Sequence, residues 1–268
     1  MTISQLTIRK ILLPLDVDRP SAVALNHARL LSRRFDAPVV AVYVLDPRFA
    51  ISADDAQKKL WQIVAGDDNS MPITTLVESG DPKEILRGMA DRHAADLTVI
   101  GPQAAVGSMT EPLLATTRLV WSSARAPAFR SLDVENVICG VDFTPHDVAA
   151  IEWSVAAART FGARLTLAHV TPSAALFGPG GSLDAPELKR ALVESATARL
   201  RSLVAAAPAQ TQSMIGSGER IDEVMNALIA ELASPLLVIG RRPSAGILGG
   251  QCAQITAYSN VPVLSVPT

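Results

Sequence analysis

The chain repeats itself, and this repeat constrains the fold more than any other feature of the sequence. The segment Ile11–Asp16 returns half a chain later as Val137–Asp142, and Leu97–Gly101 returns as Leu236–Gly240. The match continues after the first segment of each copy, where Ala24 corresponds to Ala150, Phe35 to Phe161, Ala37 to Ala163 and Val44 to Val170. A self-match at half the chain length indicates two copies of one domain rather than one large fold. We therefore expect a first domain over residues 1–134 and a second over residues 135–268.

Each copy is expected to alternate strands with helices. In the first copy, apolar runs predict strands over 11–15, 39–44, 73–77 and 97–100 and a fifth that begins at Pro127. Helical spacing predicts one helix after Ser21, a second over 53–65, a third opened by Gly80-Asp81-Pro82 and a fourth over about 113–123. In the second copy we expect strands over 137–141, 164–170, 210–215, 236–239 and 261–266, and helices that start near His146, Ala185, Arg220 and Gly250. This order predicts an α/β fold with two tandem, doubly wound, five-stranded parallel-sheet domains of Rossmann-like type.

Composition and charge exclude several classes of protein. The 268 residues are 49% hydrophobic and 19% charged, which supplies apolar material for two packed cores and argues against disorder. The net charge of −2 gives no long-range attraction to phosphate backbones, so nucleic acid is not an expected partner. Cys139 and Cys252 lack the spacing of a zinc site or a disulfide framework. With no signal-like or membrane-length apolar run, we expect a cytoplasmic protein that does not engage the membrane.

Candidate ligand-binding residues lie where the predicted strands end. In open α/β sheets, ligands bind outside the carboxyl ends of the strands, at the point where the strand order switches. An aspartate there can accept hydrogen bonds from a sugar or a base, and a glycine lets the backbone approach a phosphate. The residues placed at this edge are Asp16, Val44 and Gly101 in the first copy and Asp142, Val170 and Gly240 in the second.

These features resemble the universal stress protein family over nearly the whole length of both halves. The resemblance rests on the strand that leads to an aspartate, on Ala168-His169-Val170 at the end of the second strand, on the Val-Ile-Gly run and on the Pro-Val type of last strand. It implies a five-stranded α/β fold of the adenine-nucleotide alpha-hydrolase type, often in tandem. Nucleotide-binding members carry Gly-x2-Gly-x9-Gly-Ser/Thr after strand four.

The nucleotide signature of that family is degenerate in both copies. In the first copy Gly101 matches, whereas Ala104 replaces the second glycine and Leu114-Ala115 stands in place of Gly-Ser/Thr. In the second copy Gly240 matches, Pro243 replaces the second glycine, and Gly249-Gly250 follows a shortened loop. Proline cannot donate an N–H to a phosphate. The second copy still offers Arg241 and Arg242 as charge-assisted phosphate partners.

Two readings of the function follow, and a third class stays open. The first is a non-enzymatic stress-response protein that acts by association with an unknown protein partner, needs no cofactor and uses its two halves as a pseudo-dimer. The second is a switch that binds ATP or ADP in the second domain, with slow hydrolysis. The third is a binder of an unidentified small molecule. In the first reading, Asp16 and Asp142 only cap turns and the glycines serve as turn residues.

The last strand suggests how the chain would self-associate. Asn260–Pro267 is apolar, and an exposed strand edge of this kind pairs with another chain or with the sister domain. The first copy's counterpart carries Arg130, which discourages such a contact. We therefore expect an oligomer formed mainly through the second half, sensitive to Val263→Lys.

Few other residues carry a chemical signal. No metal-ligand spacing, P-loop or nucleophile elbow is present, so no catalytic residue is assigned. We expect His169 to be satisfied by a backbone carbonyl, and Thr144 to cap the helix near His146. The remaining expectations are that His27 and His93 lie on helix surfaces, that Trp61, Trp121 and Trp153 are packing residues in helices, and that Gly216–Gly218 form a turn.

Overall fold

The computed structural model describes residues 4–46, 51–65, 73–101, 118–123, 131–172, 185–208, 210–241 and 251–268. Contacts divide the chain into two compact units. The N-terminal unit comprises Thr7–Leu132 and Arg241–Pro267, and the C-terminal unit comprises Met1–Leu6, Asp133–Gly240 and Thr268. The division of the two sequence repeats at residue 134 stays a prediction.

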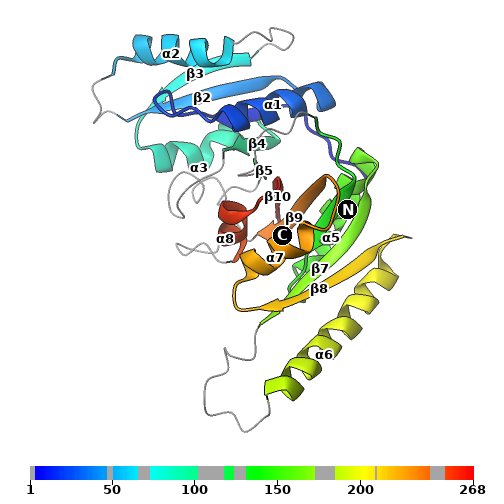
Figure 1. The fold of residues 1–268 in the computed structure, drawn as a ribbon. Coiled ribbons are helices and arrows are strands. Elements are labelled where there is room, and N and C mark those ends of the chain that lie inside the picture. The colour runs from blue at the N-terminus through cyan, green and yellow to red at the C-terminus, as the bar shows by residue number, and fades with distance from the viewer. Residues whose placement is uncertain are drawn as a thin grey trace. The chain divides into compact units, whose positions relative to one another are not determined.

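The N-terminal unit holds one mostly parallel sheet flanked by helices (Figure 1). Its strands follow the order β3-β2-β1-β4-β5-β10, in which neighbouring strands are parallel except that β10 is antiparallel to β5. The elements are β1 (Ile11–Pro14), α1 (Ala22–Phe35), β2 (Val39–Leu45), α2 (Ala53–Ala65), β3 (Ile73–Ser79), α3 (Pro82–Arg92), β4 (Leu97–Ile100), β5 (Leu119–Ser122), α8 (Gln251–Tyr258) and β10 (Val263–Pro267).

The C-terminal unit repeats the same alternation (Figure 1). Its strands follow the order β9-β6-β7-β8 and pair in parallel, so the mostly parallel α/β fold predicted from the sequence is confirmed. The elements are β6 (Asn136–Gly140), α5 (Asp147–Phe161), β7 (Arg164–Pro172), α6 (Ala185–Ala206), β8 (Gln212–Gly218), α7 (Ile221–Ile229) and β9 (Pro235–Arg241).

The last strand of the chain pairs with the last described strand of the first repeat. β10 runs antiparallel to β5, with Leu264 opposite Trp121 and Val263 opposite Ser122. Of the two partners expected for this strand, the structure shows the sister repeat of the same chain. The pairing with β5 lies within the chain, and self-association of copies through this strand stays a prediction.

Some local expectations are wrong. Residues 119–122 form β5, not the end of a helix over 113–123, and Trp121 is therefore a strand residue. Gly216–Gly218 end β8 instead of forming a turn. A Cβ at Gly216 or Gly218 would lie within 2.5 Å of the Val224 side chain, so these glycines let α7 pack closely on the strand. The fifth strand expected from Pro127 lies outside the described residues.

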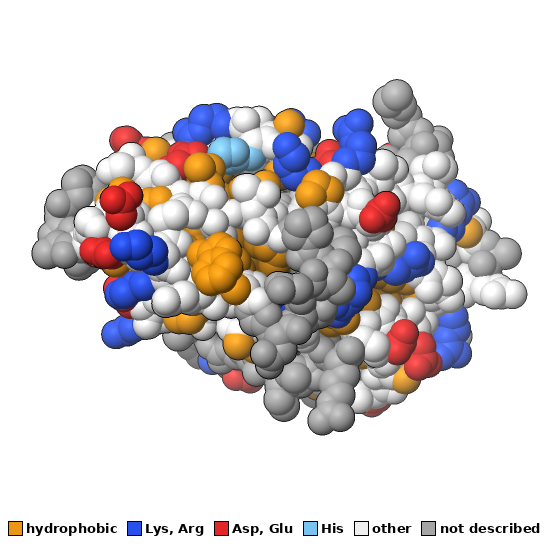
Figure 2. Space-filling model, turned by 90° about the horizontal axis from the view of Figure 1, so that it is seen from above, with side chains coloured by type: hydrophobic (Ala, Val, Ile, Leu, Met, Phe, Trp, Pro, Cys, Tyr) orange, Lys and Arg blue, Asp and Glu red, His pale blue; other side chains and the backbone are white. Residues whose placement is uncertain are grey.

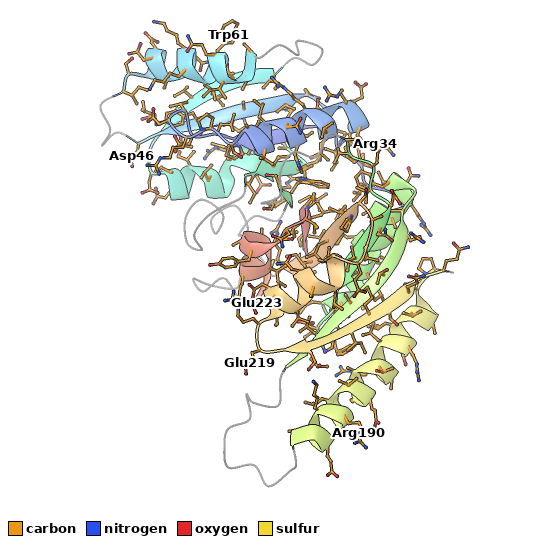
Figure 3. The ribbon with its side chains drawn as sticks, in the orientation of Figure 1. Arg34, Asp46, Trp61, Arg190, Glu219 and Glu223 are labelled. Atoms are coloured by element: carbon orange, nitrogen blue, oxygen red, sulfur yellow. The ribbon has the colours of Figure 1, made fainter. Side chains whose placement is uncertain are left out.

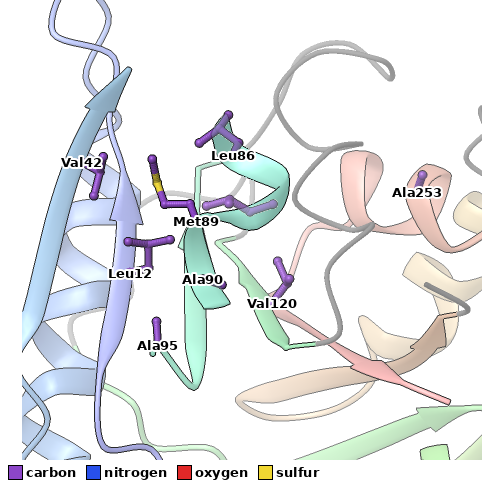
Figure 4. Close-up of a cluster of buried hydrophobic side chains, with 9 residues drawn as sticks. Leu12, Val42, Leu86, Met89, Ala90, Ala95, Val120 and Ala253 are labelled. Atoms are coloured by element: carbon purple, nitrogen blue, oxygen red, sulfur yellow. The ribbon is translucent and has the colours of Figure 1, made fainter. Parts of the chain in front are cut away.

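Helix and strand packing in the N-terminal unit converges on one apolar cluster. Met89 from α3 is fully buried beside Leu12 of β1 and Val120 of β5. Figure 4 shows these side chains pointing toward one another between the helix and the sheet. Burial of large apolar side chains contributes about 1.5–3 kcal/mol each, so this cluster holds α3 against the strands that carry the candidate site.

Candidate functional site

The strand ends that the sequence singles out share one edge of the sheet in each unit. In the N-terminal unit β1 lies between β2 and β4, and all three run in parallel, so their carboxyl ends meet at one edge. Asp16 follows β1, Val44 lies near the end of β2, and Gly101 follows β4. The order changes direction between β1 and β4, which is the switch point expected to bind a ligand. Asp142, Val170 and Gly240 occupy the matching ends of β6, β7 and β9.

Both aspartates make local turn hydrogen bonds. The Asp16 Oδ1 accepts from the N–H groups of Asp18 at 2.9 Å and Arg19 at 3.4 Å. The Asp142 Oδ1 accepts from the Thr144 N–H at 3.0 Å. These are Asx turns, in which a short carboxylate satisfies the backbone two residues on. The turn-capping role expected for both aspartates is thus present in the structure, and both side chains remain exposed at the edge.

The glycines at the ends of β4 and β9 are packed against the protein itself. A Cβ at Gly101 would lie 2.5 Å from the Ser21 Oγ, at the amino end of α1, where Ser21 caps the helix through the Ala24 N–H. A Cβ at Gly240 would lie 2.7 Å from the Thr268 Cγ2. Real Cβ atoms do not approach other atoms this closely. Each glycine therefore serves a close contact inside its own unit.

In the C-terminal unit, a buried carboxylate organises the loop after β6. Asp147, the first residue of α5, is 6% exposed, and its two carboxylate oxygens accept from the N–H groups of Asp142 at 3.1 Å and Phe143 at 2.7 Å. Burial raises the pKa of Asp147 to about 6, and the nearby Asp142 carboxylate adds to this. The capping role expected of Thr144 is not observed, since α5 has no side-chain cap at His146 and the Asp147 carboxylate bonds the loop instead.

Phe143 covers the end of β7 at the predicted cleft. Its φ of +63° lies in the left-handed region, which a residue with a bulky side chain rarely adopts. Its ring centroid lies 4.2 Å from the His169 ring centroid and 4.3 Å from the Arg199 guanidinium carbon. Arg199 also donates from Nη2 to the Phe143 carbonyl at 2.9 Å. The loop after β6 is thereby held to α6 by a side chain and a backbone contact.

His169 has the structural role expected from the sequence. Its Nδ1 lies 2.8 Å from the Val141 carbonyl, which can only accept, so this nitrogen carries the proton. Burial lowers the pKa of His169, so the ring is neutral at pH 7 with Nδ1 as the donor. This contact ties the end of β7 to the end of β6.

The N-terminal unit has charged groups at the corresponding strand ends. Lys59 on α2 reaches the Asp18 Oδ1 at 3.0 Å and so joins the helix after β2 to the loop after β1. Tyr43 lies near this edge, and its pKa is raised first by burial and then by Asp16 and Asp18. Asp46 follows β2 and lies buried at the end of this strand (Figure 3).

Arg241, proposed as a phosphate partner, is engaged inside the N-terminal unit. Its side chain is buried, and Nη2 donates to the Arg118 carbonyl. Burial lowers its pKa to about 10, so it remains charged at pH 7. The remaining candidates, Arg242, Gly249 and Gly250, lie outside the described residues, as do Ala104 and Pro243.

The sequence analysis did not identify the residues that pack at the strand ends of the C-terminal unit. Asp147 lies in the first turn of α5, and this position was not recognised as a signal for a buried acceptor. Phe143 stands directly after Asp142, where the first repeat has Val17, and this change in size was the available signal. Nothing in the local pattern of α6 distinguishes Arg199 from the helix's other basic residues.

The described surface carries charges of both signs and no evident metal site. Figure 2 shows Lys and Arg side chains interspersed with Asp and Glu on the face it presents, around scattered hydrophobic groups. Within the described ranges, no cluster of three or more His, Cys, Asp or Glu side chains could hold a metal ion. Over the same ranges, no helix has the length and apolar character needed to span a bilayer.

Comparison with known families decides the identity. The sequence matches the universal stress protein family twice, over residues 7–115 and 134–267. The chain belongs to the universal stress protein family. It is a tandem member with two family domains, and its elements alternate as the resemblance implied. A search of curated proteins gave no match.

Solved structures of universal stress proteins share the fold over the full length. A universal stress protein from Archaeoglobus fulgidus superposes with a TM-score of 0.66 at 16% identity and covers 96% of this chain and 98% of its own. The functionally unknown protein PA1789 from Pseudomonas aeruginosa gives a TM-score of 0.62 at 14% identity, with 97% and 92% covered. Another Pseudomonas aeruginosa protein, described as a putative universal stress protein, gives 0.61 at 14% identity, with 97% and 93% covered. At these identities the likeness establishes the fold.

Proposed function

We propose that this universal stress protein acts in the cytoplasm by association with a protein partner and without a bound nucleotide. In this proposal it performs no catalysis and requires no cofactor. The stress-response role follows from family membership, and the mode of action is inferred from the candidate site.

One observation carries the proposal: the described candidate residues already have partners within the protein. Asp16 and Asp142 accept hydrogen bonds from backbone N–H groups, and Arg241 donates to a backbone carbonyl. Neighbouring side chains occupy the space beside the Cα atoms of Gly101 and Gly240. A ligand would have to compete with these contacts. Groups that a protein uses for its own turns and packing offer less to a phosphate or a ribose.

The C-terminal unit adds a steric argument. Phe143 rests on His169 at the strand end, and Arg199 holds its carbonyl and its ring. A base bound at this edge would have to displace that ring. The alternative function is an ATP or ADP switch in the second domain. It predicts that a bound nucleotide displaces the Phe143 ring and that the free energy of binding is favourable despite this displacement.

Thermal unfolding with and without millimolar Mg-ATP tests the proposal. A ligand at 100 times its Kd stabilises the folded state by about 2.7 kcal/mol, which is several degrees for a domain of this size. We expect no shift for the wild type and none for Asp142→Ala. A shift of several degrees that disappears in Asp142→Ala would establish the switch instead. Phe143→Ala is the matched variant, because it opens the edge and leaves Asp142 in place.

A further inference from the structure

The outer strands of the two repeats, β3 and β8, differ in the side chains that protect their free edges. β8 is the outermost strand of its sheet, and among the described strands it pairs with β7 alone, from Gln212 opposite Thr166 to Gly218 opposite Pro172. Figure 1 shows it beside β7, and the strand order places β7 between β8 and β6. An outer strand presents a row of unpaired N–H and C=O groups that can template another strand.

The corresponding strand of the first repeat, β3, carries side-chain contacts that hinder pairing with another strand. Gln57 of α2 donates to the Thr75 hydroxyl at 2.6 Å and to its carbonyl at 3.4 Å. Glu78 near the end of β3 binds Arg92 at 2.7 Å and His93 at 2.8 Å. Charged groups and covering side chains are the devices by which proteins prevent edge-to-edge pairing.

β8 has none of these devices within the described part of the chain. Its sequence, Gln-Ser-Met-Ile-Gly-Ser-Gly, contains no charge and no proline. Its backbone accepts a side-chain hydrogen bond from inside the sheet, where the Thr171 hydroxyl donates to the Gly216 carbonyl. Gln212 and Ser213 are exposed, and Met214 and Ile215 are half-buried. The strand therefore offers a neutral edge of seven residues with apolar side chains still partly in solvent.

We propose that β8 is a self-association surface, on which β8 of a second copy of this chain adds antiparallel about a two-fold axis at Ile215. This arrangement places Met214 opposite Gly216 and Ser213 opposite Ser217 of the other copy. The long side chain of Met214 then lies over a glycine, and the two small polar residues face one another. No like charges meet across the pair, because the strand has none.

A second copy is favoured over a foreign peptide because the edge complements itself. A two-fold pair uses the same patch on both partners, which is the commonest arrangement in homo-oligomers. β3 could not pair with itself as easily, because Glu78 and its ion pairs would have to be accommodated. The proposal names one association surface. The role of that association in the cell rests on the proposed function, whereas the structural argument for β8 does not.

The test introduces like charges at the facing serine pair in the full-length chain. Ser213→Lys with Ser217→Lys puts lysines opposite lysines twice, and we expect a dimer Kd raised about tenfold or more by light scattering and sedimentation. Ser213→Glu with Ser217→Glu should do the same alone. An equimolar mixture of the two double variants should recover the dimer. Thr74→Lys on β3 is the matched control and should leave the Kd unchanged.

Hydrogen exchange gives a readout that does not depend on the variants. In the wild type, amides of residues 212–218 should exchange more slowly as protein concentration rises, and those of residues 73–79 should not change. A wild type that stays monomeric, with a mass of 28.3 kDa at every concentration, overturns the proposal. A dimer unaffected by the lysine variant, or variants whose mixture fails to recover it, overturns it as well. None of these readouts involves ATP, so failure here is separate from failure of the proposed function.

Discussion

The Trp121 indole N–H donates to the His27 Nδ1 over 2.9 Å, and both side chains are buried. The contact joins α1 to β5, the strand on which β10 pairs. Because Nδ1 accepts this hydrogen bond, the imidazole is neutral and carries its one proton on Nε2. Burial lowers the pKa of His27 to about 4, which fits a neutral ring.

Acid should weaken the N-terminal unit through His27. Its folded-state pKa of about 4 lies below the ordinary 6.5, so the unfolded chain binds the proton more tightly. The stabilisation is fully present above pH 6.5 and is lost as the pH falls through about 4. Relative to His27→Gln, which does not titrate, the wild type should lose about 2–3 kcal/mol in free energy of unfolding between pH 7.5 and 4.5. Urea unfolding at both values measures this, and a constant difference would contradict it.

Asp147 should give the opposite pH dependence. Its folded-state pKa of about 6 lies above the ordinary 3.8, so its contribution is full below pH 3.8 and is lost as the pH rises through about 6. Compared with Asp147→Asn, the wild type should therefore gain on the order of 1–2 kcal/mol when the pH falls from 7.5 to 4.5. Asp142→Asn should reduce this gain, because the Asp142 carboxylate adds to the raised pKa of Asp147. A wild type that loses stability relative to Asp147→Asn would refute the assignment.

Gly101→Ala should destabilise the protein through Ser21. The new Cβ would lie 2.5 Å from Oγ and 2.7 Å from Cβ of Ser21, so the helix or the strand must shift. We expect a loss of about 1–3 kcal/mol. Ser21→Gly removes both atoms and costs only a few tenths of a kcal/mol as a cap. In the double variant the penalty at residue 101 should largely disappear, and additive losses would show that the close contact is not the cause.

Two large side chains in helices should differ sharply in their effect on stability. Met89 is fully buried on α3, and Met89→Ala should cost about 2–4 kcal/mol. Trp61 is 61% exposed and stands outward on α2 in Figure 3, so Trp61→Ala should change stability by less than about 0.5 kcal/mol. Chemical unfolding of both variants tests the contrast. Equal losses would mean that Trp61 is covered in solution.

The sequence predicted regular elements well where a periodic pattern extended over several turns or a complete strand. The expected helix start after residue 53 and the strand over 97–100 match α2 and β4. β5 was missed because Leu119–Ser122 is too short for its period to distinguish a strand from a helix. It is a strand because it pairs with β4 on one side and with β10, far away in the sequence, on the other.

The same limit applies to single residues. His27 was placed on the surface, yet it lies three residues after buried Ala24 and four before buried Leu31, and this spacing was the missed signal. Trp61 was assigned to packing although it follows Leu60 and falls off the buried stripe of α2. In the candidate site, the strand-end positions were predictable from topology. The contacts that occupy them, such as Thr268 against Gly240, depend on distant segments.

The most direct test of the account is the small-molecule content of the purified protein. Acid would release whatever is bound to freshly purified full-length chain, and chromatography with mass spectrometry would identify it. We predict no adenine nucleotide at a ratio approaching one per chain, because Asp142, Gly240 and Arg241 already have partners within the protein. Adenine nucleotide at about one per chain would contradict it and establish the cleft of the second repeat as a nucleotide site.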